Sequence, residues 1–282
     1  MSKTTEHSEN RDYSGRVVAG TDGTATAEGA IDWAARYASR HGKSLVVLAA
    51  YPGADAPPSR VQRELVEVSA QRVRDADPEL EVEAVIAKGD PSDALAAASS
   101  TADLVVVGAR GESAPRRVRA LGGVADGTVT HAHGPVLIVP EGAQVEHPGP
   151  VVVGVDGSRE SAAAVALAAA EASLSGAELV AVHVWTSTTW LSDDVVPHIP
   201  EEASVRRFVE PLLTDYPDLA VEYVVKPGHP AGELVERSKT ARLVVMGSRG
   251  RGGFAGLLLG SVSRGVLRDA QSPVLVTRGA RD

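Results

Sequence analysis

Cysteine is absent from the 282-residue chain. Disulfides, thiol nucleophiles, thiolate zinc sites and iron–sulfur clusters are therefore excluded. Positive charge is also in short supply, because 28 Lys and Arg are outnumbered by 37 Asp and Glu and the formal net charge is −9. A chain with this balance is a poor general binder of nucleic acid or anionic membranes, although backbone amides and a few arginines can hold phosphate locally.

Long apolar runs are missing as well. Residues Met1 to Asp12 are polar and lack the apolar segment of a secretory signal, and the stretch Ala162–Ala172 is too short to span a bilayer. Hydrophobic residues make up 43% and charged residues 23%, which is typical of a folded soluble protein. We therefore expect a soluble, cytoplasmic protein without membrane or nucleic-acid partners.

A domain-sized repeat organises the chain. Residues 17–24 (VVAGTDGT) match residues 151–158 (VVVGVDGS), and the match continues without a gap through the following helix. It ends with residues 134–139 against 272–277. A long collinear match predicts two copies of one domain, in contrast to the short units of a solenoid. The expected organisation is a disordered tail at 1–14, a first domain at 15–140, a linker rich in Pro, Gly and Glu at 141–150, and a second domain at 151–282.

Each copy alternates apolar strands with helices. In the second copy, Val151–Val155 reads as a buried strand, Ser158 as the N-cap of a helix over Arg159–Leu174, and Gly176 as its C′ residue. Alternation of this kind predicts a parallel sheet with helices on both faces. The fold class is therefore α/β, with two tandem Rossmann-like, doubly wound, five-stranded sheets. Further strands are expected at 179–185, 220–226, 243–247 and 274–277, and further helices at 203–214, 231–239 and 261–269.

A glycine-rich segment follows the fourth strand of the second copy. It consists of residues 247–250 (GSRG), nine further residues, and then Gly260-Ser261. Gly247 and Gly250 are expected to take positive φ and let the backbone approach a ligand. Successive amides can form an anion-binding nest, and the helix that begins at Ser261 adds its N-terminal amides and dipole. A flexible loop before a serine-capped helix is the alternative, but the spacing between a strand and a helix favours phosphate binding.

Two common nucleotide motifs do not match this segment. It lacks the Gly-Lys-Ser/Thr end of a P-loop, and no regular G-x-G-x-x-G follows the first strand. Walker-type phosphoryl transfer and a nicotinamide dinucleotide site are therefore disfavoured. Asp156 follows the first strand at the same edge of the sheet, where ligands of open α/β folds bind. An Asp before a glycine often makes only an Asx-turn, but its repetition in both copies beside a glycine-rich loop favours binding.

The pattern G-x2-G-x9-G-S, with an Asp after the first strand, resembles the universal stress protein family over nearly the whole chain. The resemblance implies an adenine nucleotide alpha hydrolase-like fold, ATP with or without Mg²⁺ as ligand, and a regulatory role in stress responses. It places adenosine near Asp156, with His183 and Val184 along the adenine pocket, and the phosphates in the glycine-rich loop. It also implies an internal pseudo-dimer through residues 136–139 and 274–277, and a homodimer is plausible. The implied nucleotide-binding residues are Val155, Asp156, Gly157, Ser158, Val184, Gly247, Ser248, Arg249, Gly250, Gly260, Ser261 and Val262.

The first copy departs from this pattern. Ten residues separate Gly111 from Gly122, and Gly123 stands where the second copy has Ser261. Loss of one hydroxyl-to-phosphate hydrogen bond costs about 1–3 kcal/mol, so we expect a weaker first site. Glu112 adds a carboxylate there, for which Arg116, Arg117 and Arg119 could compensate. The weaker site comprises Thr21, Asp22, Gly23, Gly108, Arg110, Gly111, Gly122 and Gly123.

Two other functions remain open. A slow ATPase would need a general base and a Mg²⁺-binding carboxylate set, and Asp156 is the only conspicuous carboxylate near the expected site. A ligand-free dimerisation or interaction module is the second alternative, and the altered first loop favours it for the first domain only. No catalytic residue and no metal ligand is assigned. The choice between ATP, AMP and other adenine nucleotides is also open.

Overall fold

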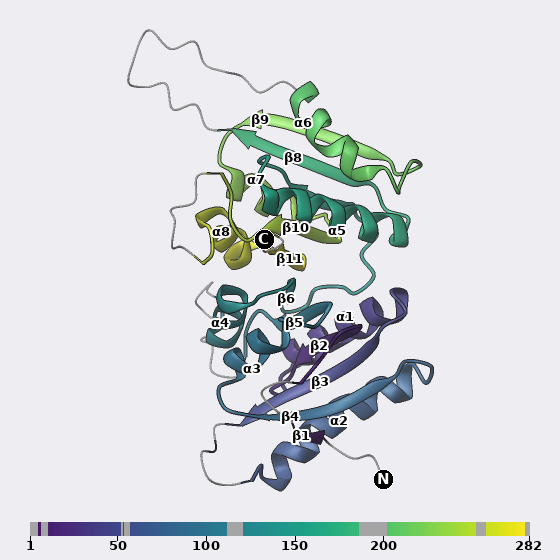
Figure 1. Cartoon of the computed structure of the whole chain (residues 1–282), viewed down its shortest axis with the longest axis vertical. Coiled ribbons are helices and arrows are strands. Elements are labelled where there is room, and N and C mark those ends of the chain that lie inside the picture. The colour runs from purple at the N-terminus through teal and green to yellow at the C-terminus, as the bar shows by residue number, and fades with distance from the viewer. Residues whose placement is uncertain are drawn as a thin grey trace. The chain divides into compact units, whose positions relative to one another are not determined.

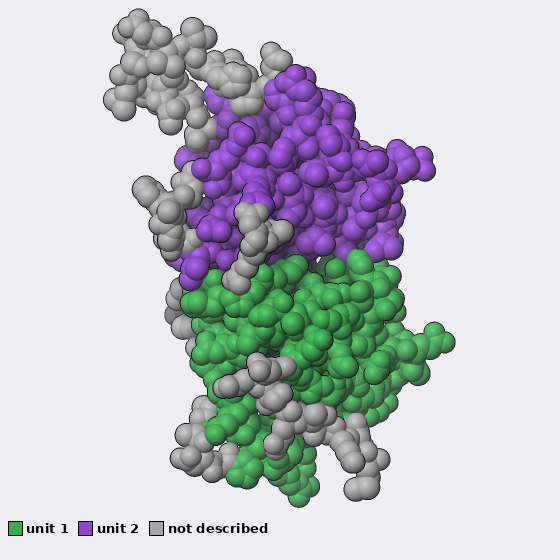
Figure 2. All heavy atoms as spheres, viewed as in Figure 1, with its two compact units in different colours: residues 1–145 green, residues 146–282 purple. Residues whose placement is uncertain are grey.

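The chain folds as two compact units, residues 1–145 and 146–282, which are coloured separately in Figure 2. In the part of the chain that the structure covers, no helix combines the length and the apolar character needed to cross a membrane. The structure is a computed structural model that describes residues 5–6, 11–51, 53, 57–111, 121–185, 202–251 and 258–279.

Unit 1 is a parallel sheet between two layers of helices (Figure 1). Its strands are β1 (Thr5–Glu6), β2 (Arg16–Gly20), β3 (Ser44–Tyr51), β4 (Val82–Lys88), β5 (Leu104–Gly108) and β6 (Val136–Val139). Its helices are α1 (Ala25–Arg40), α2 (Arg60–Ala76), α3 (Pro91–Ala98) and α4 (Gly123–His131). The strand order is β1-β4-β3-β2-β5-β6, and all neighbours are parallel. Helices α1 and α2 pack together, as do α3 and α4.

Unit 2 repeats this architecture with five strands. They are β7 (Val151–Gly154), β8 (Leu179–Trp185), β9 (Val221–Pro227), β10 (Leu243–Gly247) and β11 (Val274–Thr277). The helices are α5 (Arg159–Ser175), α6 (Glu202–Val209), the 3₁₀-helix η1 (Glu210–Leu213), α7 (Pro230–Arg237) and α8 (Ser261–Asp269). The parallel order β11-β10-β7-β8-β9 puts the first strand of the unit in the middle of its sheet. The doubly wound α/β class is thereby confirmed.

Local sequence signals account for most of these boundaries. The Ser158 side chain accepts a hydrogen bond from the Ser161 amide at the start of α5, and Gly176 ends that helix in the left-handed conformation, with φ 62°. The expected helix over 203–214 is shorter, because α6 ends at Val209 and a 3₁₀ turn follows. Pro211 explains the change, since it lacks an amide hydrogen and its ring disfavours a continued α-helix.

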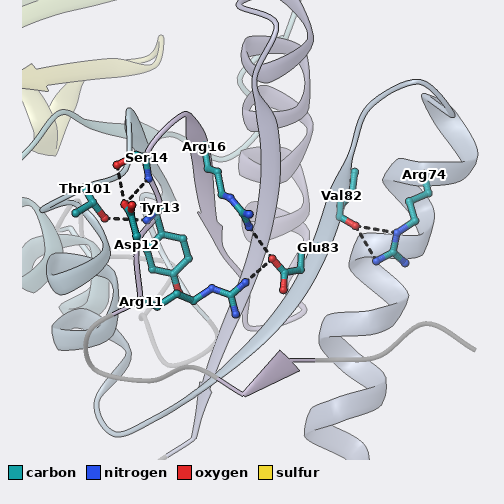
Figure 3. A network of polar contacts seen from close by, with 9 residues as sticks. All are labelled: Arg11, Asp12, Tyr13, Ser14, Arg16, Arg74, Val82, Glu83 and Thr101. Carbon is teal, nitrogen blue, oxygen red and sulfur yellow. Dashed lines mark hydrogen bonds and ion pairs between the residues drawn. The ribbon is translucent and has the colours of Figure 1, made fainter.

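The N-terminal residues that the structure describes differ from the disordered tail expected over 1–14. Tyr13 is fully buried, and its amide donates to Thr101 Oγ1 at 2.9 Å. Arg11 and Arg16 both form ion pairs with Glu83 on β4 (Figure 3). Strand β1 adds to the edge of the same strand, so unit 1 has six strands, one more than expected. Arg11 and strand β1, both within the segment expected to be disordered, are therefore partners of β4, a relationship that no local pattern reveals.

Candidate functional site

A cavity of about 620 Å³ opens in unit 2 where β7, β8 and β10 end. It lies at the switch point of the sheet, because β7 has β8 on one side and β10 on the other. Gly157 and Ser158 lie in the adjoining turn, outside the lining, and Ser248 is outside it too with a fully buried side chain. The lining contains nine of the twelve residues expected for nucleotide binding: Val155, Asp156, Val184, Gly247, Arg249, Gly250, Gly260, Ser261 and Val262.

Asp156 connects the turn after β7 with the glycine-rich loop after β10. Its Oδ1 accepts hydrogen bonds from the Ser158 amide at 2.9 Å and from Ser158 Oγ at 2.6 Å. Its Oδ2 accepts one from the Arg251 amide at 3.0 Å. Burial alone would raise the pKa of this carboxyl, but the hydrogen bonds from Ser158 and Arg251 outweigh burial and lower it. Asp156 is therefore ionised at neutral pH, and it forms the Asx-turn considered above as well as a link across the site.

Gly247 and Gly250 are needed for a different reason from the one expected. Neither has positive φ, so the prediction of left-handed backbone at these positions is wrong. A Cβ on Gly247 would lie 2.6 Å from Cβ of Glu160 at the start of α5. A Cβ on Gly250 would collide with Oδ2 of Asp156. Both glycines are sites of close approach, and Gly157, with φ 78°, is the residue of this site that uses the left-handed region.

The amino end of α8 faces the same cavity. Gly260 is its N-cap and supplies no side-chain cap, so the first amides of the helix have no helical partner. Ser261, Val262 and Ser263 line the cavity there. The Ser263 hydroxyl donates to Gly247 O at 3.0 Å and to Ser248 O at 3.2 Å, which fixes the loop against the helix. Backbone amides and a helix dipole directed at a hollow favour an anion.

Part of the cavity wall is apolar. Val155, His183 and Val184 were expected along the adenine pocket and all three line the cavity, with His183 Nδ1 2.7 Å from Val155 O. Leu234 of α7 and Met246 of β10 complete the wall and were missed by the sequence reasoning. Both occupy ordinary apolar positions of their elements, so no local signal separates them from core residues. The cavity also includes Gly154, Ser161, Val182, Pro230 and Arg251.

Two guanidinium groups reach the lining from the glycine-rich loop. Arg249 Nη2 lies 3.5 Å from Glu160 Oε1, and its side chain is 47% exposed. The guanidinium of Arg251 lies close to Gly157, next to the turn that Asp156 closes. Arg249 and Arg251 outnumber the single carboxylate, Asp156, among the described lining residues. Arg249, which pairs with Glu160, and Arg251 are therefore the cationic side chains of the described lining.

Unit 1 contains the corresponding cavity, of about 810 Å³. Asp22 repeats the Asx-turn, since its Oδ1 accepts from the Thr24 amide at 3.1 Å and from Thr24 Oγ1 at 2.6 Å. Gly23 does not line this cavity. Glu112 and the arginines 116, 117 and 119 lie outside the described residues. Seven of the eight residues expected for the first site do line it: Thr21, Asp22, Gly108, Arg110, Gly111, Gly122 and Gly123.

His131 lies outside the lining of the cavity of unit 1. It is the last residue of α4, and its Nδ1 lies 2.9 Å from Gly127 O. Over the residues for which coordinates are described, no group of three His, Asp or Glu side chains could hold a metal ion.

Two Rossmann-like units, each with a cavity at its switch point, define a tandem α/β protein. The universal stress protein family model matches residues 14–140 and 149–278. Universal stress protein Rv1996 of Mycobacterium tuberculosis is 36% identical over 304 aligned positions, which cover 94% of this chain and 96% of that protein. The chain therefore belongs to the universal stress protein family, as a tandem two-domain member.

Solved structures agree with this fold. A universal stress protein from Archaeoglobus fulgidus aligns with 96% of this chain and 98% of its own, with a TM-score of 0.67 and 21% identity. A second solved structure, from Pseudomonas aeruginosa, aligns with 94% of this chain and 93% of its own, with a TM-score of 0.67 and 18% identity.

Proposed function

We propose that unit 2 binds an adenine nucleotide, with ATP as the expected ligand, and that the chain is a nucleotide-responsive regulatory protein of the stress response. The observation that carries the proposal is the uncapped amino end of α8, which faces a cavity with an apolar wall. The two sides of this cavity suit the two chemically different halves of a nucleotide.

The phosphate groups would lie at the glycine-rich loop. The free amides of α8, the Ser261 hydroxyl and the guanidinium groups of Arg249 and Arg251 are donors on one side of the cavity. Each of them favours an anion, and the guanidinium groups would add charge-assisted hydrogen bonds. The base would pack on the opposite side, against Val184 and the apolar side chains around it.

Binding without fast turnover is the favoured activity. Asp156 is the only carboxylate among the described residues of this cavity, and both of its oxygens already accept hydrogen bonds. Its lowered pKa makes it a weak base. Bound nucleotide would stabilise unit 2 by mass action. The stability of unit 2 would therefore depend on the nucleotide concentration.

Isothermal titration of ATP into the full chain tests this proposal with a matched pair of variants. Ser261→Asp puts a carboxylate at the first residue of α8, where it stabilises the helix but repels phosphate. Gly123→Asp makes the same change at the start of α4, and a Cβ there meets no atom within 4 Å. We expect Ser261→Asp to abolish the tight ATP site and Gly123→Asp to leave it unchanged. Equal ATP affinity in the wild type and Ser261→Asp would reject the proposed site.

A further inference from the structure

The cavities of the two units differ in charge although they share one fold. Among described residues, the cavity of unit 1 has two carboxylates, Asp22 and Asp90, and one guanidinium, that of Arg110. The cavity of unit 2 has one carboxylate, Asp156, and two guanidinium groups. Glu160 pairs with Arg249 in unit 2, and the charged residues of 112–120 lie outside the described part of unit 1. The difference that the described residues establish is the additional carboxylate of Asp90, which disfavours a phosphate beside it.

Asp90 is the additional carboxylate in the cavity of unit 1. It is the N-cap of α3, and its Oδ1 accepts hydrogen bonds from the Ser92 amide at 2.8 Å and from Ser92 Oγ at 2.5 Å. The hydrogen bonds from Ser92 lower its pKa, so the carboxylate is ionised at neutral pH. His229 stands at the matching position of unit 2, where it makes no side-chain cap and does not line the cavity.

An anion would therefore meet different helix ends in the two units. In unit 2, both α7 and α8 begin without a side-chain cap. Among the described helices of unit 1, α4 alone does, because the side chains of Thr24, Ser59 and Asp90 cap the others. The first residue of α4 is also Gly123, which has no hydroxyl to offer. The features that favour phosphate in unit 2 are thus weakened or reversed in unit 1.

The first cavity is nevertheless built to hold an organic ligand. It is larger than the second, and its walls include Leu48, Leu95 and, from α2, Leu65. Helix α2 also contributes Gln62, whose Oε1 accepts the Ser59 amide at 2.8 Å in a capping box. Its Nε2 has no hydrogen-bond partner among the described residues and can donate to a ligand. No described residue of α6 lines the second cavity.

We infer that the cavity of unit 1 takes an uncharged nucleoside, in contrast to the polyphosphate nucleotide of unit 2. The base packs against the leucines, Gln62 donates to a ring nitrogen, and ribose hydroxyls donate to Asp90. A carboxylate accepts hydrogen bonds from hydroxyl groups and repels phosphate. Asp90 therefore favours an uncharged nucleoside over a nucleotide. This inference rests on the proposed function, since it assumes that the repeated cavity takes nucleoside-type ligands.

Equilibrium dialysis of the full chain with radiolabelled adenosine, with and without saturating ATP, tests the inference. We expect about one equivalent of adenosine to remain bound at saturating ATP, because the two ligands occupy different units. Asp90→Asn keeps an N-capping residue on α3 and should weaken this adenosine binding about tenfold, as expected for loss of a charge-assisted hydrogen bond. Gln62→Glu keeps an acceptor for the Ser59 amide, removes the Nε2 donor, and should also weaken adenosine binding. His229→Asp, the matched control in unit 2, should leave it unchanged.

The outcomes separate this inference from the proposed function. Complete displacement of adenosine by ATP, or adenosine binding that is unaffected by both unit 1 variants, would overturn the inference. If ATP does not bind but adenosine does, and Asp90→Asn weakens it, the proposed function fails and the inference stands. Thermal unfolding of each variant identifies any loss of binding that comes from loss of the fold.

Discussion

The carboxylate of Asp156 accepts a hydrogen bond from the backbone amide of Arg251, which is 95 residues away, at 3.0 Å. The same carboxylate closes the turn after β7 through Ser158. One side chain therefore ties the first strand of unit 2 to the glycine-rich loop that follows β10. We therefore expect the shape of the cavity to depend on this link.

Asp156→Asn should destabilise unit 2 by about 1–3 kcal/mol at neutral pH, because the Arg251 amide loses its charged acceptor. The pKa of Asp156 is lowered from the ordinary value of 3.8. The stabilisation is therefore present above that value and is lost as the pH falls through the lower pKa of the folded state. Urea unfolding from pH 7 to pH 3 should show the difference between wild type and variant shrinking at the acid end. Asp215→Asn, at an exposed position, is the control.

Gly250→Ala should break the same link from the other side, since the added Cβ collides with Oδ2 of Asp156. We expect about a tenfold loss of ATP affinity, equivalent to about 1.4 kcal/mol, measured by calorimetry. Gly29→Ala in α1 is the matched control, because its Cβ meets no atom within 4 Å. That control should raise stability by about 0.5–1 kcal/mol and leave binding unchanged. Unaltered affinity in Gly250→Ala would show that the loop adapts without Asp156.

Exchange of one hydroxyl between the units should change their phosphate affinities in opposite directions. Ser261→Gly removes the hydroxyl at the start of α8 and should weaken ATP binding in unit 2 by about 1–3 kcal/mol. Gly123→Ser adds a hydroxyl where the structure leaves open space, and it should raise the low affinity of unit 1 for phosphate without making ATP its preferred ligand. Titrations that resolve the two sites measure both effects. Changes of the same sign in the two variants would contradict a role for the hydroxyl.

Tyr13 should make unit 1 sensitive to alkali. Burial raises its pKa from 10.0 to about 12, so the unfolded chain releases the phenolic proton first as the pH rises. Stability is unaffected below pH 10 and falls between pH 10 and 12, by about 2–3 kcal/mol for two pKa units. Tyr13→Phe should lose this part of the alkaline destabilisation, as measured by denaturant unfolding at pH 9 and pH 11. Tyr51→Phe is the comparison variant.

Local patterns in the sequence were sufficient for most of the fold. Continuous apolar runs identified the strands, and Ser158 and Gly176 marked the ends of α5 through capping chemistry that involves only near neighbours. The repeat then carried each assignment from one unit to the other. Where a local rule was overlooked, as at Pro211, the boundary was wrong by a few residues.

The sequence predicted the glycine-rich loop and Asp156 of the candidate site, but it did not predict all of the apolar residues that line the cavity. The glycine-rich loop and Asp156 carry distinctive spacing, whereas Leu234 and Met246 look like any core residue until the helix and strand that hold them meet. Asp90 gave no signal beyond that of a helix cap, and only its position in the cavity of unit 1 suggests a second role.

The sequence by itself therefore determined the repeat, the order of strands and helices, and the phosphate-type loop, because each depends on residues close together in the chain. The tertiary structure alone decided which side chains share a cavity, that Gly247 and Gly250 serve close approach, and that Tyr13 is buried. The physical reason is that these features arise from contacts between distant segments. Such contacts exist only once the sheet order has brought the carboxyl ends of its strands together.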